Sequence, residues 1–348
     1  YIFEKSGGVW PSIETKKLKT ASPAVEDIFG VSVAISGDYA IVGAHGEGTG
    51  GVNAGAAYIF ERSEGTWPST ETKKLKAASP TTEDLFGTSV AISGDYAIVG
   101  AQGENTGGVN SGAAYIFERF EGTWPSTETK KLKVASPVLN DSFGYSVAIS
   151  GDYAIIGAYT QDTGETNAGA AYVFERSEGT WPSTETKKLI AASPEEEDYF
   201  GYSVAISGDY AIVGGYGEGT DYILSGAAYV FERSGGVWPS TETKKLKARD
   251  HEFGDIFGYS VAISGDYAII GAYGENTGGE DAGAVYIFER SEGAWPSTEN
   301  KRLKAASPSE SSRFGYSVAI SGDCAIVGTY FEDLGGINSG TAYIFEYI

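Results

Sequence analysis

The amino-acid sequence predicts an all-β fold, a six-bladed β-propeller with four-stranded antiparallel blades and a 57-residue repeat. The first observation is a fixed period: six tryptophans follow one another at intervals of 57 residues, at Trp10, Trp67, Trp124, Trp181, Trp238 and Trp295. Such periods are typical of solenoids, propellers and arrays, whose units stack to bury surfaces that no single unit buries. The second observation is composition, since 49 glycines and 13% aromatic residues without a helix-favouring run indicate strands joined by many turns.

The third observation is that each copy divides into four short strands, which we name A, B, C and D in chain order. In the second copy they are expected at residues 86–93 (A), 96–101 (B), 113–119 (C) and 129–133 (D). Only Gly94-Asp95 separates A from B, and a glycine in the first central position is typical of a type II′ hairpin turn. Small residues on A suit a crowded inner strand, while lysines on D suit an exposed outer edge. A four-stranded meander repeated six times predicts a propeller.

Two short motifs recur at fixed places in the unit. A Phe-Gly dipeptide opens strand A in every copy, and strand B ends in a sequence such as Val99-Gly100-Ala101. The Phe-Gly positions are Phe29-Gly30, Phe86-Gly87, Phe143-Gly144, Phe200-Gly201, Phe257-Gly258 and Phe314-Gly315. These motifs resemble the Phe-Gly and Gly-Ala-Pro landmarks of FG-GAP repeats, the blades of integrin α-subunit propellers and of many bacterial surface proteins.

The resemblance covers essentially the whole chain. It implies a non-enzymatic, secreted or cell-surface β-propeller for adhesion, protein recognition or structural assembly. The sequence departs from the family pattern after Gly-Ala, where the proline is replaced by His45, Gln102, Tyr159, Tyr216, Tyr273 and Tyr330.

A second departure concerns metal binding. Integrin-type blades often carry an Asp-x-Asp-x-Asp-Gly calcium loop between strands A and B, whereas this chain has a two-residue turn with one carboxylate, such as Asp95. Calcium takes about 6–8 oxygen ligands, so we predict no metal site and no cofactor. The turn aspartates are expected to hydrogen-bond to their own backbone.

Charge and composition exclude several classes of function. The formal net charge of −22 argues against nucleic acid, and no apolar run approaches the length needed for membrane insertion. The only cysteine, Cys324, excludes an internal disulfide. No Ser-His-acid set recurs, because His45 and His251 lie in different copies, so we predict no catalytic residues and no enzyme. An axial hydrolase would require an asymmetric polar cluster in the central channel.

The copies differ from one another in the loops between D and A and between B and C. Examples are residues 24–27, 195–198 and 221–224. In an up-and-down meander both loops leave the same end of the blade, which makes that face the expected ligand surface. The face also carries many carboxylates, which predict either a solvated acidic rim or loose cation binding. They include Glu195, Glu196, Glu197, Asp198, Asp250, Glu252, Asp255, Glu280 and Asp281.

Copies three to six place one tyrosine after Phe-Gly and a second after strand B. These candidate ligand-binding residues are Tyr145, Tyr159, Tyr202, Tyr216, Tyr259, Tyr273, Tyr316 and Tyr330. The corresponding residues in the first two copies are Val31, His45, Thr88 and Gln102. Exposed rings could stack on a partner's side chain or on a sugar, which makes a multivalent carbohydrate-binding lectin the alternative function. The rings could instead plug the channel or pack between blades.

The tryptophans precede proline on the hairpin between C and D, at the opposite end of the blade, and are expected to staple neighbouring blades.

The chain enters and leaves on strand C, at residues 1–4 and 343–346, so strand C occurs seven times. We predict one domain over residues 1–348 whose termini share a blade, with strand D near residues 15–19 completing the last sheet. The surplus strand predicts possible self-association through the terminal strands.

Overall fold

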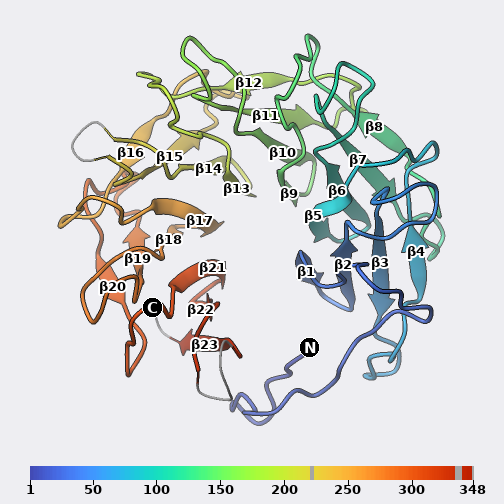
Figure 1. The fold of residues 1–348 in the computed structure, drawn as a ribbon, viewed down its shortest axis with the longest axis horizontal. Helices are drawn as coiled ribbons and strands as arrows, with labels where there is room; N and C mark the ends of the chain where they lie inside the picture. Colours follow the sequence, from blue (N-terminus) through green and yellow to red (C-terminus); the bar gives the residue numbers. More distant parts are fainter. Residues whose placement is uncertain (220–222, 334–338, 347–348) are drawn as a thin grey trace.

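The computed structural model describes residues 1–219, 223–333 and 339–346. Six antiparallel sheets follow one another around a ring, with strand A of each nearest the centre and, in the five sheets that contain it, strand D at the rim (Figure 1). The predicted all-β, six-bladed propeller is therefore confirmed. In the part of the chain that is described, no helix is long and apolar enough to cross a membrane.

Five blades contain four strands in the order A-B-C-D, and the last contains three. The strands of the first three blades are β1 (Val33–Ser36), β2 (Tyr39–Ala44), β3 (Ala56–Glu61), β4 (Lys73–Leu75), β5 (Phe86–Ser93), β6 (Tyr96–Ala101), β7 (Ala113–Glu118), β8 (Lys130–Leu132), β9 (Ser146–Ser150), β10 (Tyr153–Ala158), β11 (Ala170–Glu175) and β12 (Lys187–Leu189). Those of the other three are β13 (Ser203–Ser207), β14 (Tyr210–Gly215), β15 (Ala227–Glu232), β16 (Lys244–Leu246), β17 (Phe257–Ser264), β18 (Tyr267–Ala272), β19 (Ala284–Glu289), β20 (Lys301–Leu303), β21 (Phe314–Ser321), β22 (Cys324–Thr329) and β23 (Thr341–Glu346).

The turn between strands A and B has the predicted form. Ser93 pairs with Tyr96 across the turn, and Gly94 has a φ of 56°, as the first central residue of a type II′ turn requires. The aspartate carboxylates behave differently from the expectation. Asp95 accepts a hydrogen bond from Arg119 Nη1 at 3.1 Å, because the arginine at the end of strand C reaches the turn of its own blade. The predicted bond of this carboxylate to its own backbone is therefore wrong.

Hydrophobic core fills the space between successive blades. Val90 and Ile92 on β5 are each 7% exposed and pack with Ile41 and Ile59 of the preceding blade. At the inner end the backbones approach closely: a Cβ built on Gly100 would lie 1.9 Å from the carbonyl oxygen of Gly144 in the next blade. Glycine is therefore required at the end of strand B, which explains the recurring Gly-Ala motif.

The tryptophans pack between blades, as predicted. Trp124 is 3% exposed, and its ring lies edge-on to Tyr39 of the preceding blade with 5.8 Å between centroids. The same contact joins Tyr96 to Trp181, Tyr153 to Trp238 and Tyr210 to Trp295.

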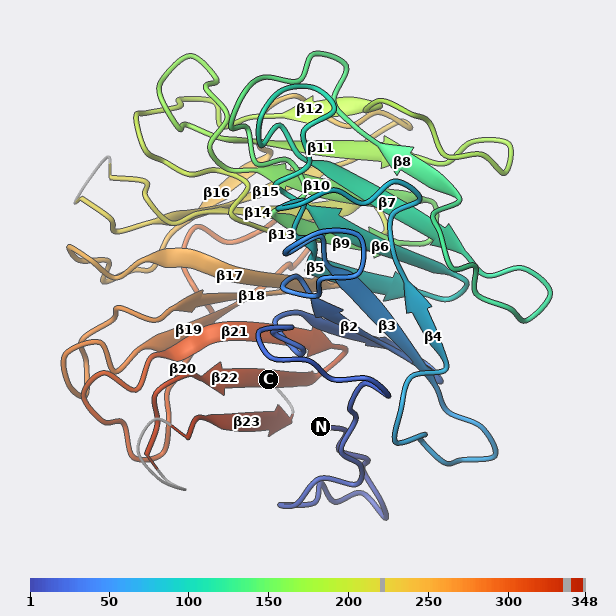
Figure 2. The same ribbon diagram turned by 45° about the vertical axis from the view of Figure 1, so that its right-hand side comes forward.

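The ends of the chain differ from the expectation. The last sheet contains only β21, β22 and β23, while Lys16 pairs with Ile2. The N-terminal segments expected as strands C and D thus form their own hairpin through the bridge between Ile2 and Lys16, because closing a short local loop costs less entropy than joining the two chain ends. Ile2 and Leu18 of this hairpin pack on the first blade, and the segment runs between β23 and β4 (Figures 1 and 2). The prediction that residues 15–19 complete the last blade is therefore wrong.

We predict that Trp124→Ala lowers the free energy of unfolding by about 3–5 kcal/mol, because it leaves a large cavity between two blades. Trp10→Ala is the matched control: Trp10 is only partly buried, and we expect a loss of about 1 kcal/mol or less. Urea unfolding followed by circular dichroism measures both. Equal losses for the two variants would show that the ring does not act as a staple.

Candidate ligand-binding site

Both variable loops leave the same face of the ring, as expected. The loop between B and C of one blade lies against the loop between D and A of the next: the Asn53 side-chain amide donates to Glu83 at 3.2 Å, and the Glu83 amide donates to the Val52 carbonyl at 2.9 Å. The variable residues Asp221 and Tyr222 lie outside the described residues. The two loops of neighbouring blades thus lie side by side on this face.

The eight tyrosines singled out by the sequence come together on this face. We call them the tyrosine arc; each of the last four blades contributes one ring at the start of strand A and one directly after strand B. A shift of register between Phe257 and Ser260 places Tyr259 in a β-bulge. Bulges re-aim side chains, and the ring of Tyr259 at this bulge contacts Tyr202 and Tyr316 of the neighbouring blades.

The rings of the arc touch one another continuously from blade to blade. Neighbouring strand-A rings are separated by 4.9 Å (Tyr145 to Tyr202), 4.8 Å (Tyr202 to Tyr259) and 5.0 Å (Tyr259 to Tyr316) between centroids. The two rings of one blade are as close, with 4.4 Å between Tyr145 and Tyr159. These are the distances of favourable aromatic pairs, so the rings pack between blades around part of the inner rim.

Each ring of the arc nevertheless keeps part of its surface open, and Tyr330 is 55% exposed. Burial raises the pKa of Tyr145 to about 12, although a hydrogen bond with Tyr202 lowers it. Burial, followed by the nearby Tyr145, raises the pKa of Tyr202 as well. The hydroxyls of Tyr145 and Tyr202 therefore remain neutral near pH 7 and can donate or accept hydrogen bonds beside an aromatic surface.

Three further residues extend the arc. Tyr199 stacks on Tyr216 with 5.1 Å between centroids and 14° between planes, and Phe331 packs edge-on to Tyr330 at 4.5 Å. The Arg313 guanidinium lies 4.9 Å from the Phe331 centroid and 5.3 Å from that of Tyr273. Each of the three occurs in one copy only, so a search for residues shared between copies misses them. The sequence indicates them only by position: Tyr199 and Arg313 directly precede a Phe-Gly, and Phe331 follows strand B.

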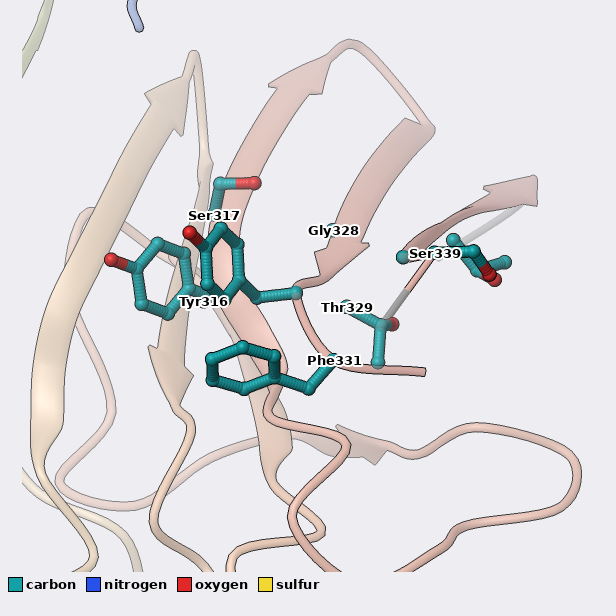
Figure 3. A pocket seen from close by; sticks show the side chains of 9 residues that line it. Tyr316, Ser317, Gly328, Thr329, Phe331 and Ser339 are labelled. Carbon is teal, nitrogen blue, oxygen red and sulfur yellow. The ribbon is translucent and has the colours of Figure 1, made fainter. Parts of the chain in front are cut away.

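A cavity of about 500 Å³ lies beside the last blade, at the end of the arc (Figure 3). Tyr316 and Tyr330 form one side, and Ser317, Gly328 and Thr329 lie at the ends of β21 and β22. The cavity is therefore lined by aromatic rings at the end of the arc and by backbone of the last blade.

The acidic residues of this face fall into two groups. Glu195, Glu196 and Glu197 are exposed, as a solvated rim requires, whereas Asp198 and Asp255 are buried. The Asp198 carboxylate accepts the Glu195 backbone N–H at 2.8 Å and so closes its loop. Within the described residues, no group of three or more His, Cys, Asp and Glu side chains is placed to hold a metal ion.

The buried aspartates lie beside a second buried acid from the loop between B and C. Glu218 is 1% exposed and is paired with Lys245 at 2.7 Å and Lys247 at 3.0 Å. Burial, with the nearby charge of Glu218, raises the pKa of Asp198 to about 6. In the third blade Gln161 takes the place of the second acid, and its amide donates to Asp141 at 2.9 Å. The Asp198 carboxylate that anchors its loop is therefore less favourable in the ionised form than an exposed carboxylate would be.

We predict that Asp198→Asn stabilises the protein by about 1–3 kcal/mol at pH 7, since one pKa unit corresponds to about 1.4 kcal/mol. The folded-state pKa of Asp198 is raised, so its contribution is complete below its unfolded pKa and is lost as pH rises through about 6. The variant should therefore match the native protein near pH 3.5 and exceed it at pH 7. Melting temperatures from pH 3.5 to 8 measure this.

The control for this change is Asp162→Asn, which alters an exposed loop carboxylate. Its melting curve should follow the native one at every pH. A difference between native protein and Asp198→Asn that does not vary with pH would contradict a raised pKa.

The FG-GAP repeat family model matches residues 13–60, 69–117, 127–174, 183–231, 240–288 and 297–345. No curated protein sequence matches the chain. Among solved structures, the chain is similar to a putative 6-phosphogluconolactonase from Bacteroides uniformis, with 11% identity, a TM-score of 0.54 and coverage of 91% of this chain and 86% of that one. It is also similar to the computationally designed Ika8 protein, with 12% identity, a TM-score of 0.46 and coverage of 91% and 70%.

Proposed function

The chain belongs to the FG-GAP repeat family, and on that premise we propose that it is a non-enzymatic propeller, secreted or on the cell surface, that binds a protein partner in adhesion, recognition or structural assembly. The observation that carries the proposal is the tyrosine arc, a contiguous and partly open aromatic surface on the face of the variable loops. The similarity to a lactonase, at 11% identity, concerns the fold alone.

The surroundings of the arc favour a protein ligand. Tyrosine is enriched at the energetic centres of protein interfaces, because a large rigid ring carries a polar hydroxyl. The variable loops also expose apolar side chains, such as Leu139 (57%), Ile223 (69%) and Phe253 (66%). Exposed carboxylates lie between them, and the net charge is −22, so the favoured partner presents apolar groups within a basic rim.

A multivalent lectin is the second candidate. Aromatic faces bind the apolar faces of sugars, and the arc presents tyrosines from four neighbouring blades. The exposed apolar loop residues argue against this reading, because they would remain uncovered by a small glycan.

Secretion or surface display is tested separately, by antibody labelling of intact source cells and of their medium; protein found only inside the cells would exclude both.

We predict that the double variant Tyr273→Ala/Tyr330→Ala binds its protein ligand at least about tenfold more weakly, since buried interface tyrosines contribute more than about 1 kcal/mol each. The labelled protein is applied in parallel to arrays of extracellular proteins and of glycans. Tyr267→Ala is the matched control, because Tyr267 lies beside the turn between A and B, at the opposite end of its blade. Binding to glycans alone, lost in the double variant, would establish the lectin; binding to proteins unaffected by it would remove the arc as the site.

We propose in addition that the chain self-associates through its last strand. β23 pairs with β22, and within the described residues its outer edge has no strand beside it. Such an edge accepts a strand from another chain. The Ile59 carbonyl on the equivalent strand accepts from Thr72 of strand D, so the backbone of Ile344 faces this open edge.

We predict that Ile344→Pro weakens self-association at least about tenfold, because proline removes an N–H that faces the edge while the bonds to β22 remain. Sedimentation velocity over a range of concentrations measures the association of both proteins. Val52→Asp, a substitution of an exposed residue in a loop, is the control and should associate like the native protein. A native protein that stays monomeric at every concentration would contradict the proposal.

A further inference from the structure

Four rings of the tyrosine arc, one from each of the last four blades, form a row at the start of strand A. They are Tyr145, Tyr202, Tyr259 and Tyr316, and we call them the phenol row. Neighbouring rings of the row lie 4.9, 4.8 and 5.0 Å apart between centroids. The Tyr202 hydroxyl is hydrogen-bonded to the hydroxyls of Tyr145 and Tyr259, and the Tyr259 hydroxyl to that of Tyr316. Each blade of the row is thus joined to the next by a ring contact and by a bond between two phenols.

Ring contact and a bond between hydroxyls together bring the same edge of two rings side by side. In such a pair, the carbon atoms next to the hydroxyl-bearing carbon of one ring lie beside the equivalent atoms of the other. These ortho carbons carry unpaired electron density when a phenol loses an electron and a proton, and two oxidised phenols couple through them. In the product, dityrosine, the two hydroxyls also lie next to each other. The phenol row therefore already holds its tyrosines in an arrangement close to that of the coupled product.

Other side chains that oxidants attack are absent, remote or buried. Methionine and cysteine are common targets of oxidants in proteins, and this chain contains no methionine and one cysteine. Cys324 begins β22 beside the turn between strands A and B, at the opposite end of the blade from the phenol row. The tryptophans between blades are buried, such as Trp124 and Trp238 at 3% and 2% exposure. The rings of the phenol row are each partly exposed, so an oxidant in solution reaches them.

The tyrosines of strands B and C have partners of other kinds. Those that begin strand B donate to a glutamate of strand C, as Tyr96 does to Glu118 at 3.0 Å and Tyr210 to Glu232 at 3.1 Å. Those of strand C in the first five blades are buried, as Tyr115 is at 3% exposure. Coupling of two phenols is therefore favoured at the phenol row.

We propose that the phenol row is a site of oxidative cross-linking, at which tyrosines of neighbouring blades are joined as dityrosine by hydrogen peroxide acting through a one-electron oxidant such as a haem peroxidase. Each of the two phenols gives up one electron and its hydroxyl proton. The two radicals join through the ring carbons beside the hydroxyls, and the hydrogens on those carbons return to the two oxygens as the rings regain aromaticity. One molecule of peroxide takes up the two electrons and the two protons and becomes two molecules of water.

The pairs of hydroxyls decide which tyrosines are joined. If each ring couples once, the products are either the two bonds Tyr145 to Tyr202 and Tyr259 to Tyr316, or the single bond Tyr202 to Tyr259. Each bond joins neighbouring blades through residues that are 57 positions apart. Like a disulfide, it restricts the unfolded chain and therefore stabilises the folded ring. The inference rests on the contacts within the row, and it does not depend on the partner proposed for the arc.

The test treats the native chain, in dilute solution, with a haem peroxidase and hydrogen peroxide, and blue fluorescence reports dityrosine. Trypsin then locates the bonds, because it separates the four tyrosines of the row: Tyr145 lies in the peptide of residues 134–176 and Tyr202 in that of residues 189–233. We expect mass spectrometry to find peptides of neighbouring blades, such as these, covalently joined with their combined mass reduced by two hydrogen atoms. The protein that contains them should remain monomeric in denaturing gel electrophoresis.

Variants of the protein locate the site. Tyr145→Phe/Tyr259→Phe keeps the rings but removes one hydroxyl from every pair of the row, and it should yield none of the joined peptides because phenylalanine forms no phenoxyl radical. Tyr210→Phe/Tyr267→Phe is the matched control: it removes two strand-B hydroxyls that bond to glutamates, and it should cross-link like the native protein. Treatment should raise the urea midpoint of the native protein and leave that of Tyr145→Phe/Tyr259→Phe unchanged.

Circular dichroism before treatment establishes that each variant is folded. Dityrosine that forms only between separate chains, or only between two tyrosines of one blade, would overturn the proposal. So would equal yields of the joined peptides from the native protein and Tyr145→Phe/Tyr259→Phe, or a native chain that forms none of them. Cross-linking of the row in a protein whose arc binds no partner would contradict the function proposed above and leave this inference intact.

Discussion

The close backbone approach between successive blades is the constraint on which the structure depends. Glycine at the end of strand B meets the carbonyl of the Phe-Gly glycine in the next blade, and a methyl group there would lie about 2 Å from that oxygen, as at Gly100 and Gly157. The serine bond to the same carbonyl fixes the distance. Because every junction inside the ring repeats this contact, small residues line the centre and larger ones must fill the space that widens toward the rim.

That widening space explains the size of the residues farther out. Branched residues such as Val90 and Ile92 fill the middle of each junction, and Trp124 closes its outer end against Tyr39. Arg119 lies over the ring of Tyr39 and pairs with Asp95 and Glu61, so charge and aromatic packing are joined at one place. The sequence keeps these residues at fixed intervals because each contact spans two copies.

Repetition also explains which parts of the structure could be predicted. The period, the turn glycines and the tryptophans predicted blades, hairpins and inter-blade packing, because those features occur in every copy. Three others depend on single residues or on three-dimensional proximity. Tyr199 joins the arc in one blade only. Asp198 is buried, although the sequence of its loop is as acidic as that of a solvent-exposed loop. Lys16 pairs with Ile2, and the last sheet lacks its fourth strand. Loop carboxylates and chain ends carry no periodic signal that distinguishes these outcomes.

The tyrosine arc arises where copies diverge: four blades carry the paired rings, while Val31 and Thr88 hold the corresponding positions in the first two, so the arc has a direction and two ends around the rim. Divergence between the copies therefore defines the surface on which a ligand must be sought, whereas the residues that are identical in every copy serve the contacts between blades.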